Sequence, residues 1–100
     1  MEIKKTKSGQ TLSIKLLGRL DTNTAPELDE NIKEDLKSVD AIEMDLKELD
    51  YISSAGLRTI LVIHKTMTAK QGSLVIKNVK DEVMEVFDMT GFSSFLNIEE

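Results

Sequence analysis

Hydrophobic and polar residues alternate with two different periods along the chain, and the order of these periods predicts its elements. Residues 11–17 (TLSIKLL) alternate apolar and polar side chains, which is the period of a half-buried strand. Residues 2–6 are expected to pair with this strand across the turn signal of Ser8 and Gly9. Gly18 is predicted to end the strand.

A helical period follows over residues 25–37. Thr24 and Glu27 have the spacing of a capping box, and Pro26 lies in the first turn, where proline is tolerated. The apolar stripe of this predicted helix consists of Leu28, Ile32 and Leu36.

The same alternation of periods continues to the end of the chain. It predicts a strand at 41–46, a long helix at 55–71, a strand at 73–77 and a helix at 79–89, and it leaves open the type of the final apolar segment, 92–98. The apolar face of the long helix is predicted to hold Leu57, Ile60, Leu61, His64 and Met67, and Val62 and Ile63 are expected to broaden it. Strands that alternate with helices indicate an α/β domain in which helices pack on a sheet.

Composition narrows the class of protein. A chain of 100 residues with 40% apolar side chains suits one domain, assigned to residues 1–100. Its 13 basic and 18 acidic residues give a net charge of -5, which argues against direct binding of nucleic acid. The chain has no cysteine, no signal-peptide pattern and no apolar run that approaches the roughly 18 residues of a membrane span. We therefore expect a cytoplasmic protein without membrane insertion.

The residues most suited to a functional role lie directly before and at the start of the long predicted helix. Ser54 is predicted to cap that helix, and the small residues Ala55 and Gly56 after it would leave its hydroxyl accessible. A helix N-terminus favours an anion, so a phosphate on Ser54 could be held without unfolding. The alternative interpretation is that Ser53 and Ser54 only cap the helix, and the residues by themselves favour that simpler role.

The other candidate residues are interpreted as structural or solvent-exposed and not as functional. His64, the single histidine, lies on a partly apolar helix face, and one histidine makes neither a triad nor a metal cluster. The serine loop lacks the G-x-S-x-G pattern, and no phosphate-binding glycine loop occurs. We expect no catalytic residue, metal or cofactor. The acidic residues of the first helix are interpreted as a solvated face: Asp29, Glu30, Glu34 and Asp35.

Three motifs together resemble those of one family. Residues 18–28 (GRLDTNTAPEL) are similar to its G-x-[IL]-D segment, residues 49–61 (LDYISSAGLRTIL) to its phosphoacceptor loop, and residues 87–92 (FDMTGF) to its late F-x-[ILM]-[ST]-G-[FL] turn. The family is the STAS domain, which includes the anti-sigma-factor antagonists. The resemblance extends over nearly the whole chain and implies a mainly parallel sheet, an N-terminal edge strand and helices packed mostly on one side.

The resemblance also implies the site residues. Ser54 falls on the phosphorylated serine, with Ser53 as the less favoured acceptor, and Asp21 falls on the Asp of the first motif. Ser53 and Ala55 replace an Asp and a Ser or Thr that many members carry. Since Gly56 has no side chain, we expect a partner to approach it closely. The predicted partner-binding residues are Asp21, Ser53, Ala55, Gly56, Leu57 and Arg58.

The implied function is partner switching. The unphosphorylated antagonist would bind an anti-sigma factor that is also a serine kinase, phosphorylation of Ser54 would end that binding, and a serine phosphatase would restore it. We expect a monomer or a weak dimer. Two alternatives stay open: a STAS subunit of a membrane transport or lipid-trafficking complex without the switch, and a small enzyme with Ser54 as nucleophile, which lacks a base within its motif.

Overall fold

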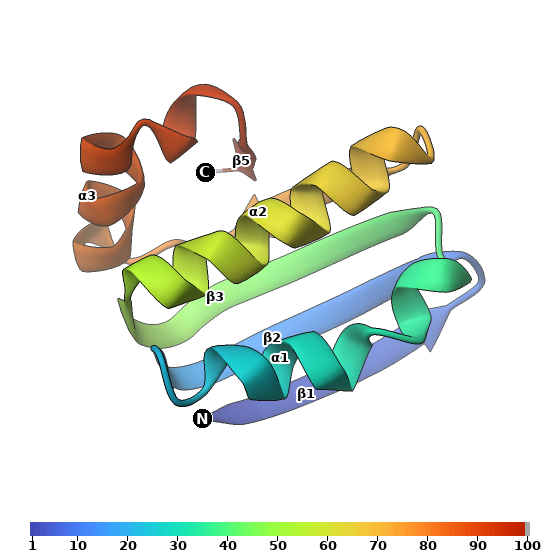
Figure 1. The fold of residues 1–100 in the computed structure, drawn as a ribbon, viewed down its shortest axis with the longest axis horizontal. Coiled ribbons are helices and arrows are strands. Elements are labelled where there is room, and N and C mark those ends of the chain that lie inside the picture. Colours follow the sequence, from blue (N-terminus) through green and yellow to red (C-terminus); the bar gives the residue numbers. More distant parts are fainter. Residues whose placement is uncertain (100) are drawn as a thin grey trace.

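The computed structural model describes residues 1–99, which form one five-stranded sheet and three α-helices (Figure 1). The strands are β1 (Glu2–Ser8), β2 (Thr11–Leu20), β3 (Ala41–Ile52), β4 (Ser73–Lys77) and β5 (Asn97–Glu99). The helices are α1 (Ala25–Ile32), α2 (Ser54–Ala69) and α3 (Asp81–Thr90), with 3₁₀ turns η1 (Asp35–Lys37) and η2 (Phe92–Ser94).

The sheet has the order β1-β2-β3-β4-β5, so strands that are consecutive along the chain are neighbours in space. β1 runs antiparallel to β2 at one edge, and the other pairs are parallel. This confirms the predicted α/β class, the mainly parallel sheet and the N-terminal edge strand. The final segment, whose type the sequence left open, supplies η2 and the short edge strand β5.

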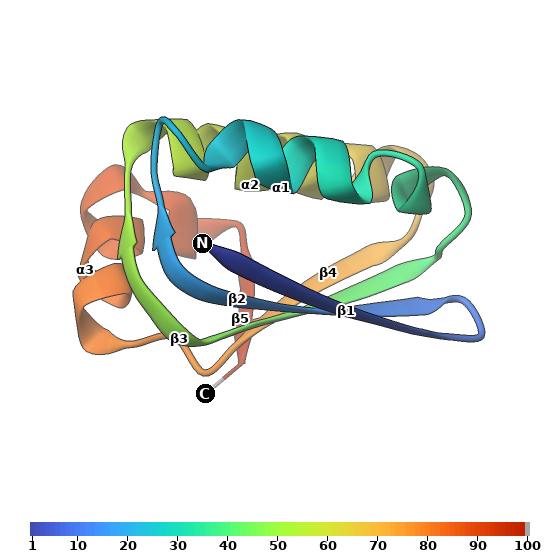
Figure 2. The same ribbon diagram turned by 90° about the horizontal axis from the view of Figure 1, so that it is seen from below.

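One face of the sheet is covered and the other is open. Figure 2 shows α1 and α2 on the same face of the sheet, as predicted, and Figure 1 shows them side by side, while α3 packs against β3. Alternate residues of β2 and β3 point into the core beneath the helices. The open face is polar, and there Lys77 Nζ lies 2.8 Å from Glu43 Oε1. The buried strand residues are Leu12, Ile14, Leu16, Leu20, Ile42, Met44, Leu46, Leu49 and Ile52.

Two strands extend further than the sequence predicted. β3 was expected to end at Leu46 and continues to Ile52, and β2 passes through Gly18 to Leu20. The register between them shifts twice, and Gly18 has a φ of +102°. Such irregularities interrupt the alternation of side chains, so a prediction that depends on period two stops too early.

The helices differ from the prediction in bounds and in buried face. α1 ends at Ile32 and gives way to η1, whereas one helix was predicted over 25–37. On α2, Leu61 and His64 are only half-buried and Ile63 is buried in their place, so the predicted face was partly wrong. The observed face is centred on Gly56, Ile60 and Met67, which lie close together around the helix at 100° per residue.

The start of α2 approaches the sheet unusually closely at Gly56. A Cβ added at Gly56 would lie 2.8 Å from both Cγ and the carbonyl oxygen of Leu20, and 2.9 Å from Cγ1 of Ile52. Two of these three atoms belong to buried side chains and the third is backbone, so there is little room for them to move. The glycine therefore sets the distance between α2 and the ends of β2 and β3.

Gly56→Ala should consequently destabilise the fold, although alanine favours helix formation by about 1 kcal/mol. We expect overpacking to prevail, with a net decrease of about 1–2 kcal/mol in the free energy of unfolding measured with urea. Ser54→Ala is the matched control, because it places alanine at an exposed site on the same helix turn and should change stability by about 0.5 kcal/mol or less. Wild-type stability of Gly56→Ala would contradict this account of the packing.

Candidate functional site

Two connections meet at the carboxyl ends of β2 and β3: residues 21–24, which lead into α1, and residues 53–54, which begin α2. The backbone N–H of Ser53 donates to the carbonyl oxygen of Leu20 at 2.9 Å and joins them. Figure 1 shows both connections at the same end of the sheet. The carboxyl ends of parallel strands are the usual position of binding sites in α/β sheets.

The first connection is a turn built around the carboxylate of Asp21. Its Oδ1 accepts hydrogen bonds from the backbone N–H groups of Asn23 at 3.0 Å and Thr24 at 3.1 Å. The Thr24 hydroxyl accepts from the Asp21 N–H at 2.8 Å and donates to the Arg19 carbonyl at 2.7 Å. The predicted capping box is therefore wrong, because the Thr24 side chain turns back to β2 and makes no cap bond to α1.

The surroundings of Asp21 also shift the pKa of its carboxyl group. Desolvation by itself raises that pKa, but hydrogen bonds from Thr24 and Asn23 and the nearby Arg19 guanidinium favour the charged form and outweigh it. The pKa of Asp21 consequently lies below its ordinary value of 3.8. The carboxylate thus holds the loop in shape at neutral pH.

Arg19 and Tyr51 form an exposed pair beside this turn that sequence reasoning missed. The guanidinium carbon of Arg19 lies 4.1 Å from the centre of the Tyr51 ring, and its Nε lies 3.7 Å from Oδ2 of Asp21. The two residues are neighbours in the β2–β3 register. The signal was absent from the sequence because β3 was predicted to end before Tyr51.

The second connection contains the two serines, and the capping role predicted for Ser54 belongs to Ser53. Ser53, not Ser54, is the N-cap of α2, and its hydroxyl accepts from the Gly56 N–H at 3.4 Å. Ser53 alone has the extended backbone, with a ψ of 176°, that allows a side chain to turn back onto the helix. Ser54 is the first helical residue and is exposed, whereas Ser53 is half-buried.

The residues after Ser54 divide between core and surface. Gly56 and Leu57 are buried against the sheet, Ala55 is half-buried, and Arg58 is exposed. The expectation that a partner approaches Gly56 is wrong, since the missing side chain accommodates Leu20 and Ile52 instead. Leu57 is likewise a core residue, with 5% of its surface exposed. Within residues 54–58, the accessible residues are Ser54, Ala55 and Arg58.

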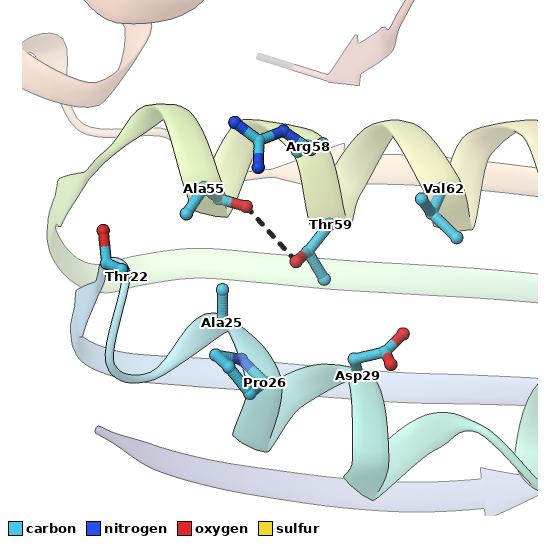
Figure 3. A pocket seen from close by; sticks show the side chains of 8 residues that line it. All are labelled: Thr22, Ala25, Pro26, Asp29, Ala55, Arg58, Thr59 and Val62. Carbon is cyan, nitrogen blue, oxygen red and sulfur yellow. Dashed lines mark hydrogen bonds between the residues drawn. The ribbon is translucent and has the colours of Figure 1, made fainter.

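A groove continues from this motif between α1 and α2 (Figure 3). Asp29 projects from α1 toward α2, and Thr59 and Val62 project from α2 toward α1. The Thr59 hydroxyl donates to the carbonyl oxygen of Ala55 at 3.3 Å, so its hydrogen is already used in a hydrogen bond within α2. Of the predicted site residues, only Ala55 and Arg58 line the groove. Its full lining is Thr22, Ala25, Pro26, Asp29, Ala55, Arg58, Thr59 and Val62.

The remaining candidates lie elsewhere. The ring of His64 packs against Phe95 with ring centres 5.2 Å apart, in line with a structural role. Within residues 1–99, no three His, Cys, Asp or Glu side chains are grouped so that they could hold a metal ion. No helix in the described part of the chain is long and apolar enough to cross a membrane.

The chain belongs to the STAS domain family, whose model matches residues 2–100. BtrV of Bordetella bronchiseptica is 46% identical over 57 residues, which span 57% of this chain and about half, 49%, of that relative. An anti-sigma-B factor antagonist of Listeria monocytogenes is 28% identical over 89 residues, covering 88% of this chain and 78% of that relative.

Solved structures have the same fold. The anti-sigma factor antagonist SpoIIAA in its unphosphorylated form has a TM-score of 0.86 at 20% identity and covers 99% of this chain and 89% of its own. Its phosphorylated form from Bacillus has a TM-score of 0.78 at 19% identity, with 99% and 92% covered. The resemblance inferred from the three sequence motifs is thereby confirmed.

The Asp21 turn predicts a pH dependence of stability. Because the folded-state pKa of Asp21 is lowered, its contribution is complete above the ordinary value of 3.8 and is lost as the pH falls through the folded-state pKa. Asp21→Asn should therefore be less stable than wild type at pH 7, with a difference that shrinks below pH 3.8. Urea unfolding across pH measures it.

Asp88→Asn, on the exposed surface of α3, controls for the loss of one negative charge. A stability difference for Asp21→Asn that stays constant, or grows, toward acid pH would mean that the ionised carboxylate does not hold this turn.

Proposed function

We propose that this protein is an anti-sigma-factor antagonist whose binding to an anti-sigma factor is switched off by phosphorylation of Ser54. The observation that carries the proposal is the division of roles between the two serines. Ser53 caps α2, so the neighbouring hydroxyl at Ser54 is left on the exposed first turn. A kinase can reach such a hydroxyl without opening the fold.

The position of Ser54 suits a reversible phosphate. The N–H groups of Ser53 and Gly56 are already satisfied by Leu20 and by the Ser53 hydroxyl. The N–H groups of Ser54 and Ala55 lie at the open end of the helix, where N–H groups and the helix dipole favour an anion. Phosphorylation would therefore add charge at the surface without breaking a bond that holds the core.

The effect on a partner is different. A phosphoserine adds about -1.5 to -2 charges and substantial bulk. A protein that packs closely over the first turn of α2 would have to bury that charge or withdraw from it. The unphosphorylated form is thus the binding form, as it is in the mechanism implied by the sequence motifs.

The partners we assign are an anti-sigma factor that is also a serine kinase and a serine phosphatase that removes the phosphate. The kinase transfers the γ-phosphoryl group of ATP to the Ser54 oxygen, the hydroxyl proton leaves to a base, and ADP is released. The antagonist itself acts by binding and not by catalysis. The assigned compartment is the cytoplasm, where such kinases and their sigma factors are found.

Phosphorylation should be confined to one residue. Incubation with ATP and the cognate anti-sigma-factor kinase should add a single phosphate, detected by intact mass and located by peptide mapping. Ser54→Ala should abolish the addition. Ser53→Ala should retain it, because Ser53 is the capping residue. Full phosphorylation of Ser54→Ala, with none of Ser53→Ala, would place the acceptor at Ser53.

Ser54→Asp should weaken binding of that kinase by at least about tenfold while leaving the fold intact. An anion in the first helix turn contributes about 0.3–1 kcal/mol, so the melting temperature should stay constant or rise slightly. Binding is measured by surface plasmon resonance and melting by circular dichroism.

Ser73→Asp is the matched control, since it adds the same exposed charge at the beginning of β4, the opposite end of the parallel strands. It should bind like wild type. A loss of binding by Ser54→Asp that accompanies a collapse of its melting temperature would mean that the change acts through unfolding, and the switch would be refuted.

A further inference from the structure

The groove between α1 and α2 is lined by the small residues Ala25 and Ala55 and by the charged residues Asp29 and Arg58. Ala25 is buried, Ala55 is half-buried, and Pro26 and Val62 are exposed, so the lining offers apolar surface at several depths. Val62 leaves 47% of its surface in solvent, which makes it one of the few large apolar side chains exposed in the described structure. Apolar surface of this kind between two helices suits a protein side chain from a partner.

The part of the chain that contains α1, on one side of the groove, is rich in acidic residues. From Asp21 to Leu36 the chain carries six acidic residues and one lysine, a net charge of -5. The remaining 84 residues carry twelve charges of each sign and are neutral as a whole. Residues 21–36 therefore carry a net charge equal to that of the whole chain.

Three of these acidic side chains are accounted for by contacts within the fold. Asp21 holds its own turn, Asp35 Oδ2 lies 2.7 Å from Lys5 Nζ, and Glu34 Oε1 lies 3.5 Å from Lys37 Nζ. Asp29 and Glu30 are exposed, and Asp29 lines the groove itself. Their field consequently acts on whatever enters from solvent.

We propose that this groove is the docking site of the anti-sigma factor, and that the factor inserts an apolar side chain flanked by lysine or arginine. The proposal rests on the proposed function and assigns it a surface. The apolar side chain contacts Ala55 and Val62, and the flanking cations face Asp29 and Glu30. A basic segment is selected because an acidic one would be repelled by the exposed carboxylates of Asp29 and Glu30.

The groove also explains how Ser54 controls docking. It begins at Ala55 and Arg58, the accessible residues directly after the acceptor. A partner seated between α1 and α2 therefore extends to the first turn of α2, where the phosphate is added. Arg58 lies on the α2 side of the groove and Asp29 on the α1 side. This difference in charge between the two sides would favour one orientation of the partner.

Two substitutions test the groove against the same anti-sigma-factor kinase in surface plasmon resonance. Asp29→Lys should lower the association rate constant about tenfold at low salt and reduce the salt dependence of wild-type binding. Val62→Ser should weaken the equilibrium affinity about tenfold through faster dissociation. Both residues are exposed, so circular dichroism should show a folded protein for each variant.

Each variant has a matched control away from the groove. Asp40→Lys makes the same charge change at the exposed residue before β3, and Met89→Ser removes an apolar side chain that is 78% exposed on α3. Both controls should bind within about twofold of wild type. Wild-type binding by Asp29→Lys and Val62→Ser, or an equal loss in Asp40→Lys, would overturn the groove proposal alone. Failure of the wild-type protein to bind the kinase would overturn the proposed function and the groove with it.

Discussion

The close contact between the first turn of α2 and the ends of β2 and β3 is the constraint on which the site depends. Gly56 lies so near Leu20 and Ile52 that even one methyl group would overlap them. This approach lets the Ser53 N–H reach the Leu20 carbonyl oxygen at 2.9 Å. A larger separation would pull the two connections apart, and the Asp21 turn would no longer lie next to the serines.

In the resulting site, the residues that hold the fold differ from the residue proposed as the switch. Ser53 uses its hydroxyl to begin the helix, and Asp21 uses its carboxylate to hold the preceding turn. Ser54 takes part in neither task among these contacts and is exposed. A residue whose side chain does not stabilise the fold can be modified and restored repeatedly, because its modification changes the free energy of unfolding little.

Charge and shape act together around that residue. The acidic residue Asp29 of α1 lines one side of the α1–α2 groove, and the proposed acceptor, Ser54, directly precedes the groove residue Ala55. An added phosphate would extend the acidic side onto the first turn of α2. The same electrostatic field that attracts a basic partner would then be joined by a charge at the point of closest packing, where the partner has least room to solvate it.

The sequence by itself determined the order of elements as far as α3, the family and the loop that contains the proposed acceptor. These features depend on local periods and on motifs of consecutive residues, such as LDYISSAGLRTIL and FDMTGF. Local patterns predict local structure well because the interactions behind them join residues a few positions apart.

Only the tertiary structure decided which serine caps the helix, that Gly56 faces the sheet and that Arg19 lies over Tyr51. Each of these depends on where β3 ends, and the shifts of register between β2 and β3 hid that end from the alternation of side chains. The groove likewise needed α1 and α2 side by side. Contacts between distant segments are set by packing, which no local period encodes.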